Sequence, residues 1–190
     1  MRLNKRLVSL LVLLAITVTA VFSACGKPDE TGVLEAFKAL YEKSIAINEY
    51  VYGAGLPSDT PWDEQTIPQY EELSDEAPYK TRAELEKAIL EVYSGDYYND
   101  AMVYGLFSGY GESQKLSARY SEKNGALTVD VSDKGRDVSG RFDTSTAVIV
   151  ELSYEHAVIS ATYTKGDSVS TYELSMVMTQ NGWRFDIPTF

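Results

Sequence analysis

The hydrophobic period changes once along this chain, and that change limits the possible folds more than any other feature. Between residues 32 and 112, apolar residues recur three and four positions apart, as on one face of a helix. Between residues 113 and 190 they recur at every second position, as in half-buried strands. We therefore predict one α+β domain over residues 32–190. Two or three N-terminal helices should pack on a curved antiparallel sheet of about six strands.

Three helices are predicted in the helical half. The second opens at a capping box, in which Thr81 accepts from the amide of Glu84 and Glu84 reaches back. A third, short helix is predicted over residues 97–104. The first covers residues 32–52, with one face formed by Val33, Phe37, Leu40, Ser44, Ile47 and Val51.

Glycine-containing turns separate the strands that we predict in the sheet half. Asn124-Gly125 is a pair that a two-residue hairpin turn favours, and alternating apolar residues flank it. Lys165-Gly166-Asp167 and Asn181-Gly182 mark later turns. The strands around these later turns are predicted over residues 146–154, 157–163, 170–179 and 183–187.

The first residues of the chain have the layout of an export signal. A cationic start precedes residues 7–21, which are almost wholly apolar. This run is shorter than the ~20 residues that a membrane-spanning helix needs. Small residues then lead to a cysteine in the segment Phe22-Ser23-Ala24-Cys25-Gly26. The cationic start consists of Arg2, Lys5 and Arg6.

That segment resembles a lipobox, in which the cysteine receives a diacylglyceryl group and becomes the mature N-terminus. The resemblance implies a signal peptide over residues 1–24, a lipidated Cys25 and a polar tether over residues 25–31. The chain would then sit on the extracytoplasmic face of a bacterial membrane, because acyl chains anchor a protein firmly there. The alternative is an ordinary signal peptide with an incidental cysteine.

The charge of the mature chain limits its partners. The chain has 17 basic and 28 acidic residues, and residues 1–24 hold three of the basic ones and no acidic one. Removal of the signal leaves 14 basic and 28 acidic residues, a net charge of −14. Such a domain repels nucleic acid and anionic lipid, so a cationic partner is the better match. Because Cys25 is the only cysteine, we expect no disulfide and no thiolate chemistry.

A long connection and an excess of tyrosine indicate a partner-binding surface. Residues 56–80 contain four prolines and several aromatic residues among their acids, which is unusual without a function. Ten of the 14 tyrosines lie between residues 41 and 110, and tyrosine is enriched at interfaces. The alternatives are a plain irregular segment and tyrosines at the boundary of the core. Our candidate partner-binding residues are Trp62, Tyr70, Glu71, Glu72, Tyr97 and Tyr98.

No catalytic set, metal site or cofactor motif stands out. His156 is the only histidine, no Gly-x-Ser-x-Gly elbow is present, and we interpret His156 as a surface or turn residue. Neighbouring acids such as Asp96 and Asp100 are expected by chance among 28 acidic residues. Asp130, Asp133 and Asp137 lack the spacing of an EF-hand loop. We therefore predict no catalytic residue, no metal ligand and no cofactor, which favours a protein that is not an enzyme.

The order of elements and the last strand, Asn181–Ile187, resemble a cystatin-like or nuclear-transport-factor-two-like α+β roll. A narrower resemblance is to secreted inhibitors of cell-wall DL-endopeptidases. Residues 79–94, Asn124-Gly125 and the ending from Gly182 to Pro188 carry it. This resemblance implies a non-enzymatic protein that blocks a peptidoglycan hydrolase. We carry over no inhibitory residue, because no motif identifies one.

Two classes of function follow from these observations. The first is a membrane-anchored binding protein of the cell envelope, whose partner is a cell-wall hydrolase or another envelope protein. The second is an enzyme or a small-molecule carrier that uses a pocket between helices and sheet, since rolls of this kind often contain one.

Overall fold

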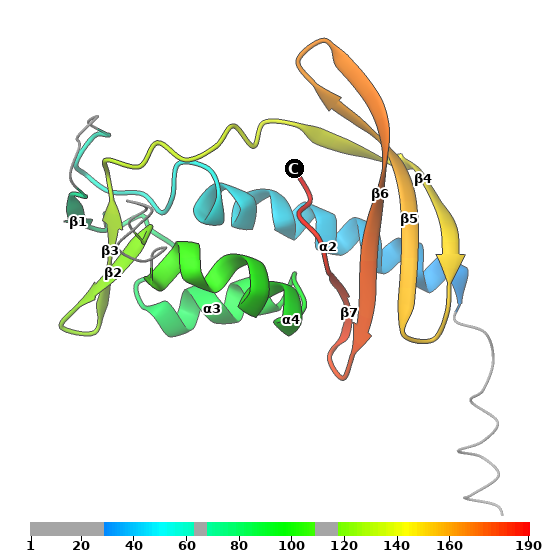
Figure 1. Ribbon diagram of the computed structural model, residues 1–190, viewed down its shortest axis with the longest axis horizontal. Coiled ribbons are helices and arrows are strands. Elements are labelled where there is room, and N and C mark those ends of the chain that lie inside the picture. Colours follow the sequence, from blue (N-terminus) through cyan, green and yellow to red (C-terminus); the bar gives the residue numbers. More distant parts are fainter. Residues whose placement is uncertain (1–28, 63–67, 109–117) are drawn as a thin grey trace, which may run out of the picture.

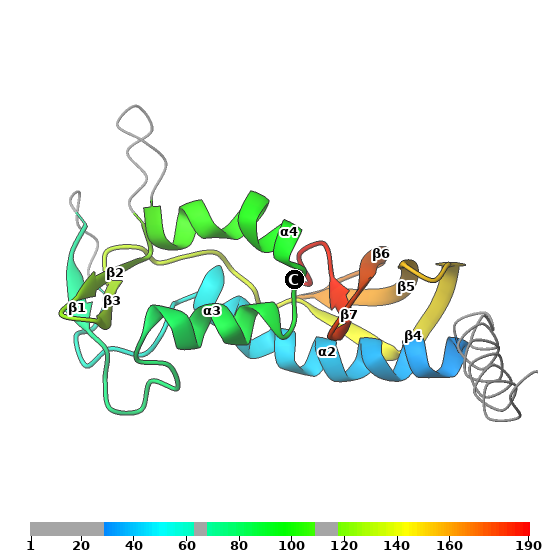
Figure 2. The ribbon, with the colours of Figure 1, turned by 90° about the horizontal axis from the view of Figure 1, so that it is seen from below.

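The computed structural model describes residues 29–62, 68–108 and 118–190. The predicted signal peptide, Cys25 and most of the tether lie outside these residues. The described part is α+β, as predicted. In Figures 1 and 2 the molecule is elongated, with one long helix along much of its length and an antiparallel sheet towards each end.

The long helix, α2, is Glu30–Val51. It begins where Asp29 accepts hydrogen bonds from the amides of Thr31 and Gly32, which would otherwise lack partners. Its 22 residues span about 33 Å at 1.5 Å per residue. All six residues of the predicted face are buried as expected, and Tyr41 and Asn48 are buried beside them.

The second helix, α3, is Arg82–Leu90, and its capping box forms as predicted. The hydroxyl of Thr81 accepts from the Glu84 amide at 3.3 Å, and the Glu84 carboxylate accepts from the Thr81 amide at 3.1 Å. The carboxylate also accepts from the Lys80 amide at 2.8 Å, and the hydrogen bonds from the amides of Lys80 and Thr81 lower the pKa of Glu84. The local sequence therefore determines where this helix begins.

The third predicted helix forms with a different geometry. It begins at Gly95, where Ser94 caps the short helix α4, Gly95–Tyr97. It then continues as two π-helical segments, η1 (Tyr98–Met102) and η2 (Tyr104–Ser108). A π turn inserts a residue into the α-helical pattern and often lies at a functional site.

The strands form two antiparallel sheets in the described residues. The small sheet has the order β1-β3-β2, and its strands are β1 (Tyr70–Glu72), β2 (Tyr120–Lys123) and β3 (Ala126–Asp130). The large sheet has the order β4-β5-β6-β7, and its strands are β4 (Arg141–Leu152), β5 (His156–Lys165), β6 (Ser168–Thr179) and β7 (Gly182–Phe185). The Asn124-Gly125 turn has φ of 55° and 82°, as a type I′ hairpin requires.

The prediction of one sheet with about six strands is therefore wrong. The strand pattern identifies segments with one buried face, but it does not say which strands pair. After β3, residues 131–140 form an unpaired connection that carries the chain along the molecule to β4 (Figure 1). This connection separates the first hairpin from the later meander.

One hydrophobic core joins the helices to both sheets. On the large sheet, the ring of Phe37 in α2 packs edge-on against Phe185 in β7, with 5.8 Å between ring centroids. At the same sheet, the Tyr41 hydroxyl accepts from the amide of Phe142 in β4 at 2.7 Å. On the small sheet, Leu127 in β3 belongs to the same core. The helix α2 therefore keeps the two sheets apart at opposite ends of one packed unit.

Candidate functional site

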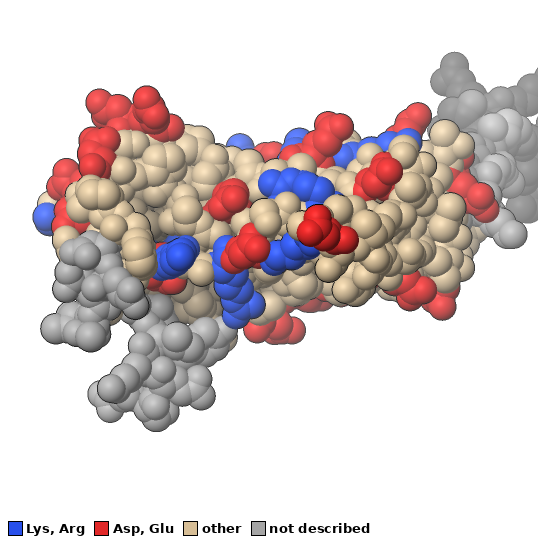
Figure 3. Space-filling view, turned by 90° about the horizontal axis from the view of Figure 1, so that it is seen from above, with Lys and Arg blue, Asp and Glu red and all other residues tan. Residues whose placement is uncertain are grey.

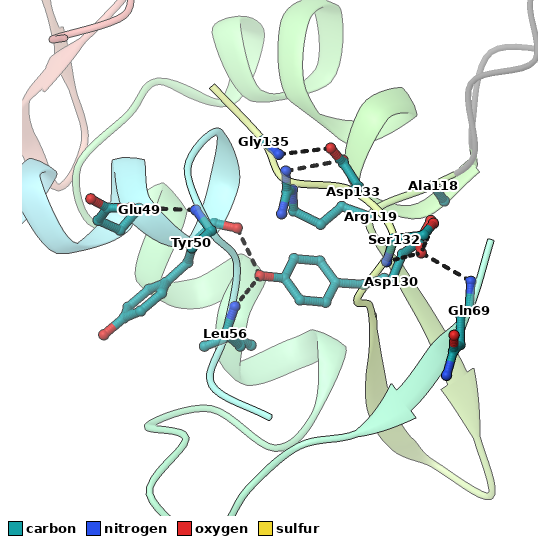
Figure 4. A network of polar contacts seen from close by, with 12 residues as sticks. Glu49, Tyr50, Leu56, Gln69, Ala118, Arg119, Asp130, Ser132, Asp133 and Gly135 are labelled. Carbon is teal, nitrogen blue, oxygen red and sulfur yellow. Dashed lines mark hydrogen bonds and ion pairs between the residues drawn. The ribbon is translucent and has the colours of Figure 1, made fainter. Parts of the chain in front are cut away.

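The C-terminal end of α2 meets the small sheet and two connections, and polar contacts concentrate there (Figure 4). The buried hydroxyl of Tyr120 accepts from the amide of Leu56 at 2.8 Å and donates to the carbonyl of Tyr50 at 2.7 Å. Burial raises the pKa of Tyr120, so the phenol keeps the proton that it donates. This residue fixes the chain as it leaves α2.

Asp130, at the end of β3, organises the entry to β1. It is 1% exposed, and its Oδ1 accepts from the amide of Gln69 and the amide of Ser132, both at 3.0 Å. The hydroxyl of Ser132 donates to the same oxygen at 2.6 Å. Since hydrogen bonds to a carboxylate are strong, Asp130 holds the start of β1 against the connection after β3.

Arg119 lies between these elements and is 4% exposed. Its Nη2 pairs with Asp133 Oδ2 at 3.0 Å, while Asp133 Oδ1 accepts from the amide of Gly135 at 2.8 Å. The backbone amide of Arg119 donates to the carbonyl of Gly105 in η2 at 2.9 Å. Its Nη1 has no hydrogen-bond partner among the described residues. Figure 4 shows the guanidinium turned towards the chain that follows α2 and away from the small sheet.

Two hollows open on this region, and Asp133 contributes to both. The first, which we call the tryptophan hollow, has a volume of about 340 Å³, and its lining includes Leu56, Pro57, Pro61, Trp62, Val129 and Asp130. The second, which we call the arginine pocket, has a volume of about 260 Å³, and its lining includes Val51, Tyr52, Met102, Leu106, Arg119 and Arg136.

Four of the six candidate binding residues gather at this end of the molecule. Trp62 is 47% exposed, and Lys134 lies over its ring at 5.5 Å from the centroid. Tyr70 is 37% exposed and pairs with Asp130 across β1 and β3. The side chain of Glu71 accepts from Gln69 at 2.9 Å, and Glu72 is exposed at the end of β1.

The other two candidates lie elsewhere. Tyr98 is 6% exposed, and its hydroxyl donates to Glu86 Oε1 at 2.6 Å. Burial raises the pKa of Tyr98. Tyr97 is half-buried, and its hydroxyl lies 2.9 Å from that of Tyr52, which lines the arginine pocket. We therefore define the distal surface as Trp62, Tyr70, Glu71 and Glu72, without these two tyrosines.

Figure 3 shows a group of acidic side chains at the end formed by the small sheet, and further acidic side chains over the middle and the opposite end. Lys and Arg lie mostly nearer the middle. Glu71 and Glu72 lie at the end formed by the small sheet, because β1 is a strand of that sheet. An acidic end with exposed aromatic rings fits a cationic partner surface better than an anionic one.

The groups considered for chemistry are dispersed. The His156 ring lies in the large sheet, where its Nε2 is 2.9 Å from the hydroxyl of Ser175. Asp137 pairs with Lys165 of β5, and Asp133 pairs with Arg119. Within residues 29–62, 68–108 and 118–190, no three His, Cys, Asp or Glu side chains are grouped so that they could hold a metal ion. His156 and the carboxylates of the distal end therefore do not share a site.

The sequence reasoning missed Arg119 because of its position beside a strand. Arg119 lies between Ala118 and Tyr120 in an alternating apolar pattern, and positions of this kind face solvent in a half-buried strand. However, β2 begins only at Tyr120, so Arg119 precedes the alternating part and turns into the core. Its one sequence signal is a cation next to a tyrosine in a strongly acidic chain.

Comparison with known proteins does not identify this chain. No protein-family model matches it, and no curated protein is similar enough to count as a relative. Among the helices of the described residues, none is both long and apolar enough to cross a membrane. The function must therefore be argued from the arrangement of the chain's own residues.

Proposed function

We propose that the protein is an extracytoplasmic lipoprotein, anchored to a bacterial membrane through a diacylglyceryl group on Cys25, and a non-enzymatic binding protein of the cell envelope. The observation that carries this proposal is the position of the distal surface. Tyr70 begins β1, which lies towards the end of the molecule opposite the start of α2 (Figure 1), and Trp62 lines a hollow with Val129 and Asp130 of β3. Both rings are exposed. A lipid at Cys25 would leave that end free for a partner.

The partner that we propose is a peptidoglycan hydrolase, which the distal surface would inhibit. Aromatic rings of this kind often contribute most of the energy of a protein interface. The acids of β1 suit a hydrolase with a basic cleft, because complementary charges steer association. A net charge of −14 on the mature chain argues against nucleic acid as the partner.

The finer fold assignment is also part of this proposal. The large sheet is an antiparallel meander, and α2 packs across one of its faces through Phe37 and Tyr41. One helix held against such a meander supports a cystatin-like roll over α2 and β4–β7. The small sheet and α3 would then be additions that form the distal end.

The experiment is a digestion assay with the full-length chain in neutral detergent. A cysteine-dependent DL-endopeptidase digests peptidoglycan, and turbidity reports the rate. We expect saturable slowing by the wild-type protein. The Trp62→Ala variant should need about tenfold more protein or higher for the same inhibition, as the loss of an interface hot spot implies.

The matched control is Tyr172→Ala, because Tyr172 is 53% exposed on β6, outside the distal surface. Inhibition by this variant should equal that of the wild type. No slowing at large excess would contradict the hydrolase as partner. Equal inhibition by the Trp62 and Tyr172 variants would contradict the distal surface.

A second function, a small-molecule carrier, is favoured by one specific observation. The arginine pocket lies between helical segments and the connections that precede β2 and follow β3, and a buried arginine lines it. His156 is not among its lining residues, and Asp133, the carboxylate among them, is paired with Arg119, so the lining suits binding better than acid–base catalysis.

A further inference from the structure

We propose that the arginine pocket binds a small monocarboxylate with an apolar body. This site is separate from the distal surface and does not depend on the hydrolase as partner. Unused hydrogen-bond donors, the charge balance of the lining and the size of the pocket support this ligand class.

The unused donors belong to the two arginines of the lining. A buried guanidinium nitrogen without an acceptor destabilises a protein, so Nη1 of Arg119 calls for an explanation. The side chain of Arg136 is exposed and has no ion-pair partner among the described residues, although its backbone amide is fixed to the carbonyl of Tyr52 at 2.6 Å. A carboxylate is the acceptor whose geometry matches a guanidinium.

The charge of the lining selects a monoanion. Arg119 and Arg136 contribute two positive charges, and Asp133 contributes one negative charge. The lining therefore has a net charge of +1, which one negative charge on the ligand neutralises. A phosphate dianion would leave the occupied pocket with a net negative charge. The strongly acidic mature chain adds a general repulsion of more highly charged anions.

The rest of the lining is apolar and supplies the surface for the ligand body. Val51 comes from the last turn of α2, and Ala101, Met102 and Leu106 come from the π-helical segments. Irregular helix of this type often shapes ligand sites. A volume of about 260 Å³ admits a small acid or the last residue of a peptide chain.

Tyr52 forms the wall beside Arg136. Its hydroxyl lies 2.9 Å from that of Tyr97, and its ring lies 4.6 Å from the ring of Phe190. Burial raises the pKa of Tyr52, so the wall stays uncharged and leaves the arginines as the charged donors. This aromatic packing holds the wall in place before any ligand arrives.

Gly55, in the connection that follows α2, covers Nη1 of Arg119 on one side. Its φ is 91°, and a Cβ at this position would lie 3.0 Å from Nη1 and 3.1 Å from Val129. A carboxylate reaches Nη1 only after a small shift of the turn Gly53–Gly55. The amides of Gly53 and Gly55 donate to the carbonyls of Asn48 and Glu49, so this shift must bend or break those two hydrogen bonds.

The test is calorimetric titration of the full-length chain in neutral detergent with four probes. N-acetylalanine presents a small free acid, and trialanine presents the same carboxylate at the end of a peptide. N-acetylalaninamide has the size of the first without its charge, and inorganic phosphate is a more highly charged anion. We expect saturable binding of one or both carboxylates. Tighter binding of N-acetylalanine would indicate a free small acid as the ligand, and tighter binding of trialanine would indicate the C-terminus of a peptide. The amide and phosphate should bind at least tenfold more weakly.

Two variants connect such binding to the pocket. Arg136→Gln removes an exposed cation, and Arg119→Lys keeps the charge but loses the fork of donors. Each should weaken carboxylate binding by about tenfold, as expected for a charge-assisted hydrogen bond. If the buried Arg119→Lys variant does not fold, the exposed Arg136 variant decides. Circular dichroism checks folding.

The control is Lys134→Gln, which removes a neighbouring cation that does not line the pocket. It should bind the carboxylate as the wild type does. Three results would overturn the proposal: no saturable binding of either carboxylate, equal binding of the acid and its amide, or equal loss in the Lys134 and Arg136 variants. None of these results bears on the digestion assay, so the two proposals fail separately.

Discussion

At the scale of single residues, the closest backbone approach of the candidate site occurs at Gly135. Its φ is 71°, and a Cβ there would lie 1.8 Å from the carbonyl oxygen of Gly53 and 2.7 Å from Nη2 of Arg119. Only glycine permits the connection after β3 to pass so near the end of α2. The ion pair of Arg119 with Asp133 depends on this passage, because Asp133 also accepts from the Gly135 amide.

We therefore predict that Gly135→Ala destabilises the protein more than Gly166→Ala. Gly166 also has a positive φ, of 56°, but nothing lies within 4 Å of its added Cβ. Both variants should lose about 1–2 kcal/mol from the backbone conformation. Gly135→Ala should lose a further 1–3 kcal/mol or so from overpacking. Urea denaturation measures both, and equal losses would mean that the close approach is absent.

At the scale of elements, local signals determine where helices and turns begin, and long-range packing determines the rest. The 3.6-residue period predicts α2, the capping box predicts the start of α3, and Asn124-Gly125 predicts the first hairpin. The division into two sheets and the π-helical segments depend on packing between distant residues. Sequence alone named six binding candidates, of which the structure brings four together at one end. It missed Arg119, because the burial of that residue depends on the same long-range packing.

The connection over residues 131–140 is attached to the large sheet through Asp137. Its Oδ2 lies 3.3 Å from Nζ of Lys165, and Nζ also donates to the Asp137 carbonyl at 2.8 Å. Hydrogen bonds from Ser139, together with the charge of Lys165, lower the pKa of Asp137 to about 2 from an ordinary value of 3.8. Because the pKa is lower in the folded state, ionised Asp137 stabilises the fold above pH 3.8. This contribution is lost as the pH falls towards 2.

We predict that Asp137→Asn makes stability fall less steeply between pH 4 and pH 2, because this titrating group is gone. The matched control is Asp167→Asn, an exposed turn residue that makes no hydrogen bond to the described residues. It should keep the slope of the wild type. Thermal unfolding at several pH values gives the slopes. An unchanged slope in Asp137→Asn would contradict the stabilising role of the carboxylate.

At the scale of the whole molecule, α2 is the spacer that the proposed function requires between the anchor and the distal surface. Glu30 begins the helix only five residues after Cys25, and Val51 ends it beside the arginine pocket. The 22 residues of α2 separate its start from the end where both hollows lie by about 33 Å. If Cys25 carries the lipid, the hollows are therefore held away from the membrane. The chain that the proposed cleavage before Cys25 would leave, with a net charge of −14, should resist lying flat on anionic lipid.

The most direct test of this central claim is the height of each end above a bilayer. A lipidated Cys25 leaves no free thiol, so a cysteine introduced at Tyr154 or at Asn124 is the only site for a dye. Tyr154 lies in the turn after β4, near the start of α2, and Asn124 lies in the hairpin of the small sheet (Figure 1).

Energy transfer to acceptors in anionic vesicles then measures the two distances on chains carrying the lipid. We predict efficient transfer from position 154 and a donor at position 124 that is about 30 Å farther from the bilayer, close to the length of α2. Equal distances, a reversed order or absence of lipid on Cys25 would contradict the account.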